Sequence, residues 1–310
     1  MSSNEPLSAA SSAAPVHAPA VPPAGAHAGE PLSVSDRGTG KYYMRFTRTD
    51  RITHALMVVS FFGLVLTGVP LRFSYAPWAR PLMELLGGTQ TAGLIHRICG
   101  VITFAYAGLH LVVLVSRFLK ARSKKGFFVG PRSMVPWKKD AQDVAGMFKW
   151  FFGRGPRPQF DRYNYLDKFD YWAEVWGVFA IGGSGLLLWF PTFFSLFLPG
   201  WIFNIATIIH GVEALIALGF IFTIHFFNVN LRPEKFPIDL VMFTGRAREE
   251  YFKEEHPLEY EREKAAGRLA ELEVPPPTRA FYLWSLVGGF TALVIGLSTV
   301  GLIIYAVIRG

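Results

Sequence analysis

Long apolar stretches are the feature that most constrains how this chain folds. At least four of them exceed the roughly 18 apolar residues that a membrane-spanning helix needs. Only 17% of the residues are charged and 51% are hydrophobic, whereas soluble domains contain about 25% charged residues. The sequence therefore predicts an all-α, polytopic membrane protein and argues against an ordinary soluble enzyme.

The apolar stretches divide into five predicted spans. Their limits are about 49–73, 91–119, 169–194, 201–230 and 279–308. We expect the first four spans to form a transmembrane four-helix bundle within residues 41–231. The fifth span, within residues 279–310, is an additional transmembrane helix.

The remaining segments are polar or of low complexity. Residues 1–40 are rich in Ala, Pro, Ser and Gly and are predicted to be a disordered tail. In the 120–168 loop, residues 141–152 have the pattern of an amphipathic helix lying on the membrane surface. Residues 232–278 form a polar segment with a helical acidic–basic pattern over 247–272.

Basic residues gather on one side of the predicted bundle. The N-terminus, the 120–168 loop and the 232–278 segment share that side and hold nearly all Lys and Arg. The positive-inside rule places it in the cytoplasm of a bacterial cell, with the C-terminus in the periplasm and the spans in the inner membrane. The same distribution accounts for the net charge of +8 without a nucleic-acid partner.

The cysteine content limits the possible cofactors. Cys99 is the one cysteine of the chain, so an internal disulfide, a thiolate zinc site and an iron–sulfur cluster are excluded. The sequence has no Cys-x-x-Cys-His motif for covalent haem and no glycine-rich phosphate loop. A redox cofactor would therefore be held by histidine.

Five of the eight histidines lie within predicted spans: His54, His96, His110, His210 and His225. Two of them, 14 residues apart in the second span, lie within ~40° of one helix face and ~21 Å apart along the axis. Two more, 15 residues apart in the fourth span, have nearly the same spacing. Ionisable groups in a bilayer are costly and usually functional. Two layers of facing histidines predict bis-histidine ligation of two b-type haems.

Other reasons for the histidines stay open at this point. They could pack a non-redox membrane anchor, or relay protons in a proton-coupled transporter. Carboxylates within the spans are scarce, and the main ones are Glu174 and Glu213. A metal site without haem is therefore less favoured.

Several further residues are candidates for cofactor contact or proton transfer. Arg97, beside His96, could pair with a haem propionate, or anchor the helix at the interface. Asp161, Asp167, Lys168 and Asp170 lie where a quinone site would need a proton donor, although a solvated helix start would have the same composition. Small residues that would let a macrocycle approach, or simply pack helices, are Gly63, Gly68, Gly93, Gly100, Gly108, Gly182, Gly183 and Gly185.

The order of several motifs resembles a known family over about residues 41–262, the cytochrome b (gamma) subunit of formate dehydrogenase-N and its relatives. The motifs that carry the resemblance are Asp50-Arg51-Ile52-Thr53-His54, Leu94-Ile95-His96-Arg97, Gly108-Leu109-His110, Arg162-Tyr163-Asn164, Lys168-Phe169-Asp170-Tyr171-Trp172, Ile208-Ile209-His210, Thr223-Ile224-His225-Phe226, and His256-Pro257 with Tyr260-Glu261.

This resemblance implies a quinone-reactive di-haem membrane subunit. It implies that His54 and His225 hold the cytoplasmic-side haem, and that His96 and His210 hold the periplasmic-side haem. Asn164 corresponds to an asparagine beside the quinone, menaquinone or ubiquinone. A glycine of that family site is absent, because Tyr165-Leu166 follows.

The ligand of the cytoplasmic-side haem stays open between two histidines. The spacings in spans two and four also resemble the cytochrome b of quinol–cytochrome c oxidoreductases, where two helices supply all four ligands. By that resemblance His110, and not His54, would pair with His225.

Two departures from the family concern the partner. The 40-residue tail and the fifth span do not belong to the formate dehydrogenase pattern. Residues 228–245 resemble cytochromes b that accompany multihaem c-type cytochromes. We therefore expect an electron-transfer subunit of a membrane oxidoreductase. It would connect the quinone pool with a multihaem cytochrome c or an iron–sulfur subunit facing the periplasm.

Overall fold

The computed structural model describes residues 40–309 apart from 122, 234 and 237. The predicted tail, residues 1–40, lies outside the described residues except for Gly40. Within the described part, five helices are long and apolar enough to cross a membrane: Arg48–Arg72, Gly88–Lys120, Tyr165–Trp189, Trp201–Leu231 and Arg279–Arg309. They confirm the predicted all-α, polytopic fold with a fifth apolar helix.

Two of the five helices contain π-helical turns. The third comprises α6 (Tyr165–Gly177), the π-helix η2 (Val178–Gly182) and α7 (Gly183–Trp189). The fourth comprises α9 (Trp201–Phe220) and the π-helices η3 (Ile221–His225) and η4 (Phe227–Leu231). π-helical turns inside α-helices are frequent at functional sites.

The ends of the spans follow local chemistry. Helix α1 (Arg48–Arg72) begins with a capping box, in which the Thr47 hydroxyl accepts from the Asp50 amide and the Asp50 carboxylate accepts from the Thr47 amide. The third span ends at Trp189, before its predicted limit of about residue 194, because Pro191 cannot continue the helix and begins the short helix α8 (Pro191–Phe194). Helix α2 (Ala79–Leu85) joins α1 to α3 (Gly88–Lys120).

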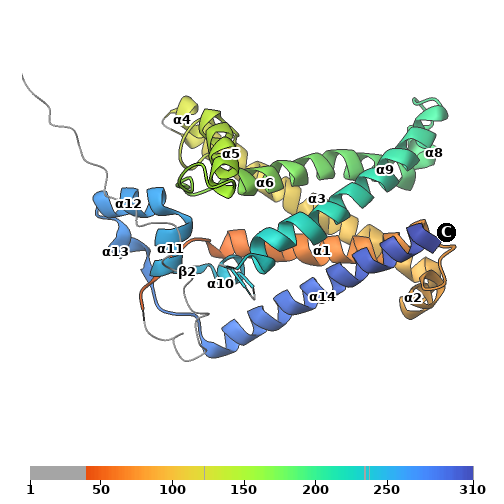
Figure 1. The fold of residues 1–310 in the computed structure, drawn as a ribbon. Coiled ribbons are helices and arrows are strands. Elements are labelled where there is room, and N and C mark those ends of the chain that lie inside the picture. The colour runs from red at the N-terminus through yellow and green to blue at the C-terminus, as the bar shows by residue number, and fades with distance from the viewer. Residues whose placement is uncertain (1–39, 122, 234, 237, 310) are drawn as a thin grey trace, which may run out of the picture. The chain divides into compact units, whose positions relative to one another are not determined.

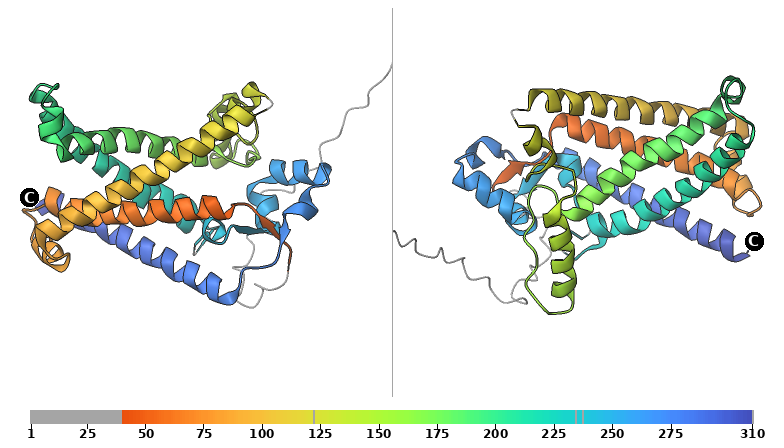
Figure 2. Two further views of the ribbon diagram at one scale, coloured as in Figure 1. Left: turned by 180° about the vertical axis from the view of Figure 1, so that it is seen from behind. Right: turned by 90° about the horizontal axis from the view of Figure 1, so that it is seen from above.

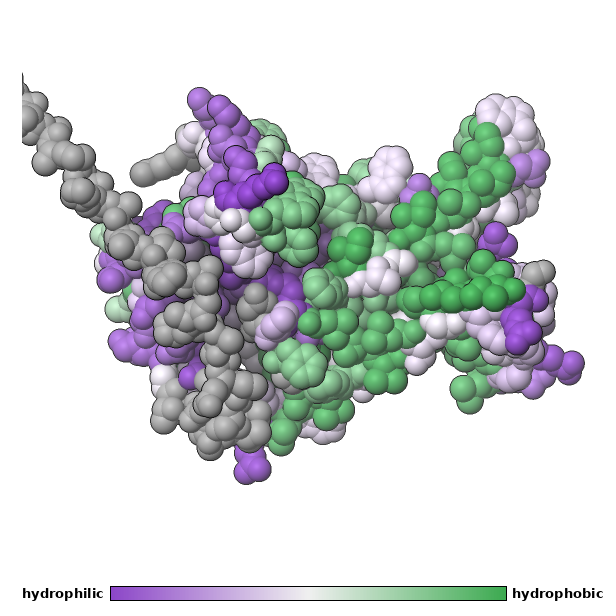
Figure 3. Space-filling view, in the orientation of Figure 1, coloured by the Kyte–Doolittle hydropathy of each residue, from purple (hydrophilic) through white to green (hydrophobic). Residues whose placement is uncertain are grey.

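The spans alternate in direction, and α1 packs along α3 while α6 and α7 pack against α9 (Figures 1 and 2). Helix α14 (Arg279–Arg309) contacts η3 beside α1. Its interface contains Val65, Phe222 and Leu293, which are all buried. Hydrophobic side chains cover the middle of the visible face, and hydrophilic ones gather at both ends (Figure 3). This is the surface distribution expected of a membrane-spanning bundle.

Residues 41–46 and 157–164 pack with the segment between α9 and α14, and we call these three parts (residues 41–46, 157–164 and 238–274) the polar cap. Its three-stranded antiparallel sheet has β1 (Tyr42–Met44) between β2 (Arg246–Arg248) and β3 (Glu273–Val274). A short helix, α10 (Val241–Thr244), precedes β2. The cap lies at the end of the bundle where α1 begins (Figure 1).

The charge pattern over 247–272 predicts one continuous helix, and this prediction is wrong. That stretch contains β2 and three short helices, α11 (Glu249–Glu255), α12 (Pro257–Ala265) and α13 (Leu269–Leu272). Pro257 cannot donate an amide hydrogen to a helix that began earlier. Gly267 has a positive φ of 70°, which ends α12.

Buried charges join the segments of the polar cap. Arg45 forms an ion pair with Glu259, which also accepts from Arg162 at 3.0 Å. Both Arg45 and Glu259 have side chains only 3% exposed. Burial and the neighbouring Arg162 charge lower the pKa of Arg45 to about 10. The cap therefore connects the chain before α1 with the loop before α6 and with α12.

The loop between α3 and α6 holds two helices, α4 (Lys124–Phe128) and α5 (Lys138–Phe151). Helix α5 covers most of the stretch for which a membrane-surface helix is predicted. Phe148 and Phe151 are 64% and 76% exposed on it. Its position at a membrane surface stays a prediction.

Candidate functional site

His96 of α3 and His210 of α9 face each other across the bundle. Their ring centroids lie 6.2 Å apart. Nδ1 of His96 lies 2.8 Å from the hydroxyl of Thr67, which itself donates to the carbonyl of Gly63 at 2.6 Å. The hydroxyl therefore accepts from the Nδ1–H group, and the tautomer leaves the Nε2 lone pair of His96 available for a metal.

His210 is held in the same way. Its Nδ1 lies 2.9 Å from the carbonyl of Ile181, which can only accept a hydrogen bond. Two imidazoles that bind opposite sides of one metal ion have ring centroids about 6 Å apart, because each metal–nitrogen bond is about 2 Å. The observed separation therefore fits bis-histidine ligation of one iron atom between His96 and His210.

Glycines make room for these two imidazoles. A Cβ atom at Gly68 would lie 3.4 Å from Cε1 of His96, and one at Gly185 would lie 3.1 Å from Cε1 of His210. Ile181, whose carbonyl holds His210, belongs to η2. The small residues and the π-helical turn thus position the ring of each histidine.

The other predicted glycines fall into two groups. Gly63 lies against Cys99 and Gly182 against Phe104, so both serve close helix packing. At the remaining four, a Cβ atom would have no neighbouring atom within 4 Å: Gly93, Gly100, Gly108 and Gly183. Space beside such glycines is compatible with the approach of a large cofactor.

His225, in η3, is bound by a carboxylate. Its Nδ1 lies 2.8 Å from Oδ2 of Asp170 on α6. A carboxylate that holds the second nitrogen of a metal-binding histidine fixes its orientation and raises its basicity. The sequence placed Asp170 only at the border of a span, so its role as the partner of His225 was not predicted.

His54 and His110 have different surroundings. His54 packs edge-to-face on Phe243 of α10, with ring centroids 5.8 Å apart. Nε2 of His110 lies 3.0 Å from the hydroxyl of Tyr171. The Nε2 atom of His110 therefore already has a protein partner.

The residues expected at the quinone site lie at the start of α6. Oδ1 of Asn164 accepts from the amides of Leu166 and Asp167 at 2.8 and 3.0 Å, and the Asp167 carboxylate accepts from the Asn164 amide at 2.9 Å. This capping box was readable from the Asn-x-x-Asp spacing. Lys168 forms an ion pair of 2.9 Å with Asp140 of α5, and both side chains are buried.

The two remaining charged candidates have protein partners. The Arg97 guanidinium lies 5.8 Å from the centroid of the Trp189 ring. Asp161 forms an ion pair of 2.5 Å with Arg262 of the polar cap. Asp161 therefore belongs to the cap and not to a solvated helix start.

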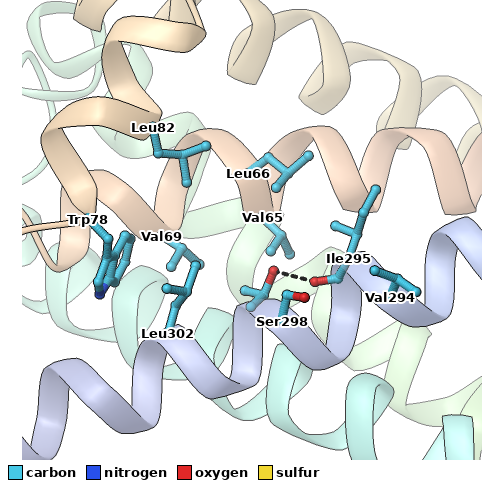
Figure 4. A pocket seen from close by; sticks show the side chains of 10 residues that line it. Val65, Leu66, Val69, Trp78, Leu82, Val294, Ile295, Ser298 and Leu302 are labelled. Carbon is cyan, nitrogen blue, oxygen red and sulfur yellow. Dashed lines mark hydrogen bonds between the residues drawn. The ribbon is translucent and has the colours of Figure 1, made fainter.

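Metal-binding side chains do not gather in larger groups in the part of the chain that the structure describes. No three of the His, Cys, Asp and Glu side chains there could hold one metal ion. A cavity of about 200 Å³ between α1 and α14 contains none of the histidines (Figure 4). Its lining consists of Val65, Leu66, Val69, Trp78, Leu82, Val294, Ile295, Ser298, Thr299 and Leu302.

Comparison with known protein families gives a match that covers the first four spans. Residues 45–233, more than half of the chain, match the family described as prokaryotic cytochrome b561. The chain belongs to this family. It is therefore a multi-pass membrane b-type cytochrome that takes part in electron transfer and binds haem b, as predicted.

Individual relatives are subunits of larger enzymes. The chain is 23% identical to the nitrate-inducible formate dehydrogenase cytochrome b556(Fdn) subunit of Escherichia coli strain K12, over 57% of this chain and 73% of that protein. It is 27% identical to the F420 non-reducing hydrogenase II cytochrome subunit of Methanosarcina mazei, over 65% and 74%. These relatives support a larger complex with redox partners, and they confirm the resemblance to the formate dehydrogenase-type cytochrome b.

Proposed function

We propose that this protein is the quinone-reactive, di-haem cytochrome b subunit of a bacterial respiratory complex. It moves electrons between the quinone pool and a periplasm-facing redox partner. The observation that carries the proposal is the facing pair His96–His210, whose Nδ1 atoms are both hydrogen-bonded and whose rings lie 6.2 Å apart. A second histidine pair near the polar cap, His54 of α1 and His225 of η3, would extend the arrangement to two cofactors.

Four histidines would hold two haem b groups, which supply one-electron redox chemistry when bound. His96 and His210 would hold one group, and His54 and His225 the other. The assignment of His54 follows the Asp50-Arg51-Ile52-Thr53-His54 motif, which resembles the first helix of the formate dehydrogenase-type cytochrome b. It is also supported by the bond between His110 and Tyr171, which occupies the nitrogen that a ligand would need.

The protein's own groups would set the orientation and charge of the ligands. Thr67 and the Ile181 carbonyl keep the Nδ1 proton on His96 and His210. Asp170 does the same for His225 and adds a negative charge. Arg97, one residue after His96, would pair with a haem propionate, because guanidinium groups bind carboxylates in a planar fork.

We place the quinone reaction near the start of α6. Asn164, Asp167 and Lys168 lie two to six residues before Asp170, the partner of His225. Asn164 would contact the quinone, menaquinone or ubiquinone, and Asp167 and Lys168 would be the nearby proton-exchanging groups. Their capping and ion-pair contacts hold them at this end of the bundle.

The partner would be a multihaem cytochrome c or an iron–sulfur subunit. The relatives named as formate dehydrogenase and hydrogenase cytochrome subunits support a catalytic partner of this general kind. The basic loops and the polar cap would face the cytoplasm, and α14 would end in the periplasm, with all spans in the inner membrane.

The decisive experiment combines haem quantitation with quinol reduction. We expect a pyridine haemochrome assay on the purified full chain to give about two b-type haems per chain, and a quinol analogue to reduce part of them. A folded preparation without haem would contradict electron transfer and favour a non-redox anchor or a proton-coupled transporter. One haem per chain would contradict the di-haem assignment alone.

A further inference from the structure

A second set of protonatable side chains lies between α3 and α6, apart from the proposed ligands. The hydroxyl of Tyr106 donates to Oε1 of Glu174 at 2.5 Å. One turn nearer to the polar cap, Nε2 of His110 lies 3.0 Å from the hydroxyl of Tyr171. Helices α3 and α6 run in opposite directions, so the two bonded pairs are stacked on consecutive turns.

The Tyr106–Glu174 pair lies at a depth between the two histidine layers. On α6, Glu174 follows Asp170 by one turn and precedes Ile181 by about two turns, and these residues hold His225 and His210. On α3, Tyr106 lies between His96 and His110. Tyr106 is 5% exposed. Glu174 is half-buried, and its carboxyl group is bonded to the buried Tyr106 side chain.

Glu174 has no basic partner among the residues that the structure describes. Its bonded neighbour is the Tyr106 phenol, beside which lie the hydroxyls of Thr103 and Ser60. The neighbouring helix α9 contains the acid Glu213, which accepts from the indole of Trp176 at 3.3 Å. A carboxylate without a counter-ion in the bilayer interior is costly, and carboxyl groups at such positions commonly relay protons.

We propose that Glu174 is an intramembrane proton-binding site that takes up one proton as one electron enters the bundle, and that the His110–Tyr171 and Tyr106–Glu174 pairs conduct that proton from the polar-cap side. The electron comes from a quinol or from the redox partner. The proton converts the Glu174 carboxylate to a carboxylic acid, and no other bond is formed or broken. Because the added electron and the added proton have opposite charges, their joint entry into a medium of low dielectric costs less than entry of the electron alone.

This inference rests on haem b binding and on the proposed ligand set, in which His110 is free to relay protons. It assigns His110 a role that haem ligation does not require. It also explains why a histidine, two tyrosines and a glutamate are bonded in pairs on two neighbouring spans.

The test is a redox titration of the purified, haem-loaded full chain at a series of pH values, with chemical mediators in place of quinol. We expect the haem midpoint potential of the wild-type protein to fall as pH rises, by at most about 59 mV for each tenfold fall in proton concentration. Glu174→Gln flattens this dependence. Glu213→Gln is the matched control, because it neutralises an acid on another span that bonds to Trp176 instead of Tyr106, and it keeps the wild-type slope.

Infrared difference spectra of the reduced and oxidised protein provide a readout that does not depend on activity. We expect a carboxylic acid carbonyl band that appears on reduction in the wild-type and Glu213→Gln proteins and is absent in Glu174→Gln. If Glu174→Gln does not assemble with haem, Tyr106→Phe removes only the bonded hydroxyl, and the same band then shifts in frequency. A wild-type slope in Glu174→Gln, or an unshifted band in Tyr106→Phe, overturns the proposal.

The conducting path has its own test. Tyr171→Phe keeps the Glu174 site but breaks the pair nearer to the polar cap. We therefore expect an unchanged equilibrium slope and slower proton uptake after rapid reduction, followed with a pH-indicator dye. Uptake at the wild-type rate overturns the path. Failure of a quinol to reduce the haem would contradict the quinone reaction and leave these titrations unaffected.

Discussion

Oδ2 of Asp170 lies 2.8 Å from Nδ1 of His225, so a carboxylate on α6 holds an imidazole on the next span. Sequence spacing identified His225 as a ligand candidate, but its bond to Asp170 depends on how the two helices are rotated. The contact provides the simplest test of whether this imidazole binds iron.

Asp170→Asn should weaken the binding of one haem and raise its midpoint potential. Asparagine keeps an oxygen that accepts from Nδ1 but removes the negative charge of the carboxylate. Because that charge stabilises the oxidised iron, its removal favours the reduced iron. Loss of outer-shell partners of metal-binding histidines typically lowers affinity about 10–100-fold. Haem content and redox titration of the variant measure both effects. An unchanged potential would show that His225 does not ligate iron.

Substitution of the two competing histidines distinguishes the ligand sets. We expect His54→Ala to lose one of two haems, because His54 is the proposed partner of His225 in holding the haem near the polar cap. His110→Ala should retain both, because the Nε2 atom of His110 is bonded to Tyr171. The pyridine haemochrome assay on each variant, with protein quantitation, gives the ratio directly. The reverse pattern would assign the ligand to His110.

Two helical glycines provide a steric test of the other histidine pair. A methyl group at Gly185 would lie 3.1 Å from the His210 ring, whereas one at Gly301 of α14 meets nothing within 4 Å. Overpacking of this kind costs about 1–3 kcal/mol. We therefore expect Gly185→Ala to lower haem retention about tenfold, since about 1.4 kcal/mol corresponds to a factor of ten. Gly301→Ala is the matched control, and equal loss in both variants would argue against a positioned His210.

The membrane spans could be predicted from sequence because the length and composition of a single apolar stretch are enough to identify a span. The histidine layers followed from helix periodicity for the same reason. The bonds of these histidines could not be predicted in the same way. Thr67 and Ile181 hold rings from other spans through a hydroxyl and a backbone carbonyl, and such contacts depend on helix rotation and on the π-helical turn η2.

The polar cap was beyond sequence reasoning for a different reason. Its central strand, Tyr42–Met44, has only three residues and pairs with strands about 200 residues further along the chain. A strand of this length has no detectable alternation of polar and apolar residues. The charges over 247–272 were interpreted as one exposed helical pattern, whereas Glu259 and Glu263 are almost completely buried.

Removal of one buried charge should destabilise the cap. Glu259 binds both Arg45 and Arg162, and its side chain is 3% exposed. Glu259→Gln leaves these cations uncompensated, and breaking a buried ion pair costs about 3–5 kcal/mol. We expect faster proteolysis of residues 247–272 at an unchanged haem spectrum. Glu84→Gln, which breaks the exposed pair with Arg80, is the control and should leave the cleavage rate unchanged.

The cap should also lose stability in mild acid through His256. This side chain is 7% exposed, and its Nδ1 donates to the carbonyl of Asp161 at 2.8 Å. Burial, with the charges of Arg45 and Lys235, lowers the pKa of His256 well below its ordinary value of 6.5. The unfolded cap therefore binds a proton below pH 6.5 that the folded cap does not bind, and its stability falls as the pH falls below that value.

Hydrogen exchange of the cap between about pH 7 and 5 measures this effect after correction for the intrinsic exchange rate. His256→Gln should remove most of the pH dependence in this range, because glutamine does not titrate. Two buried acids of the cap, Glu255 and Glu263, have pKa values below the ordinary value of 4.5. Although burial opposes it, the charges of Arg232 and Lys235 lower the pKa of Glu255 from 4.5, so its contribution is lost only below this range. A variant that keeps the wild-type pH dependence would mean that another group controls the opening of the cap.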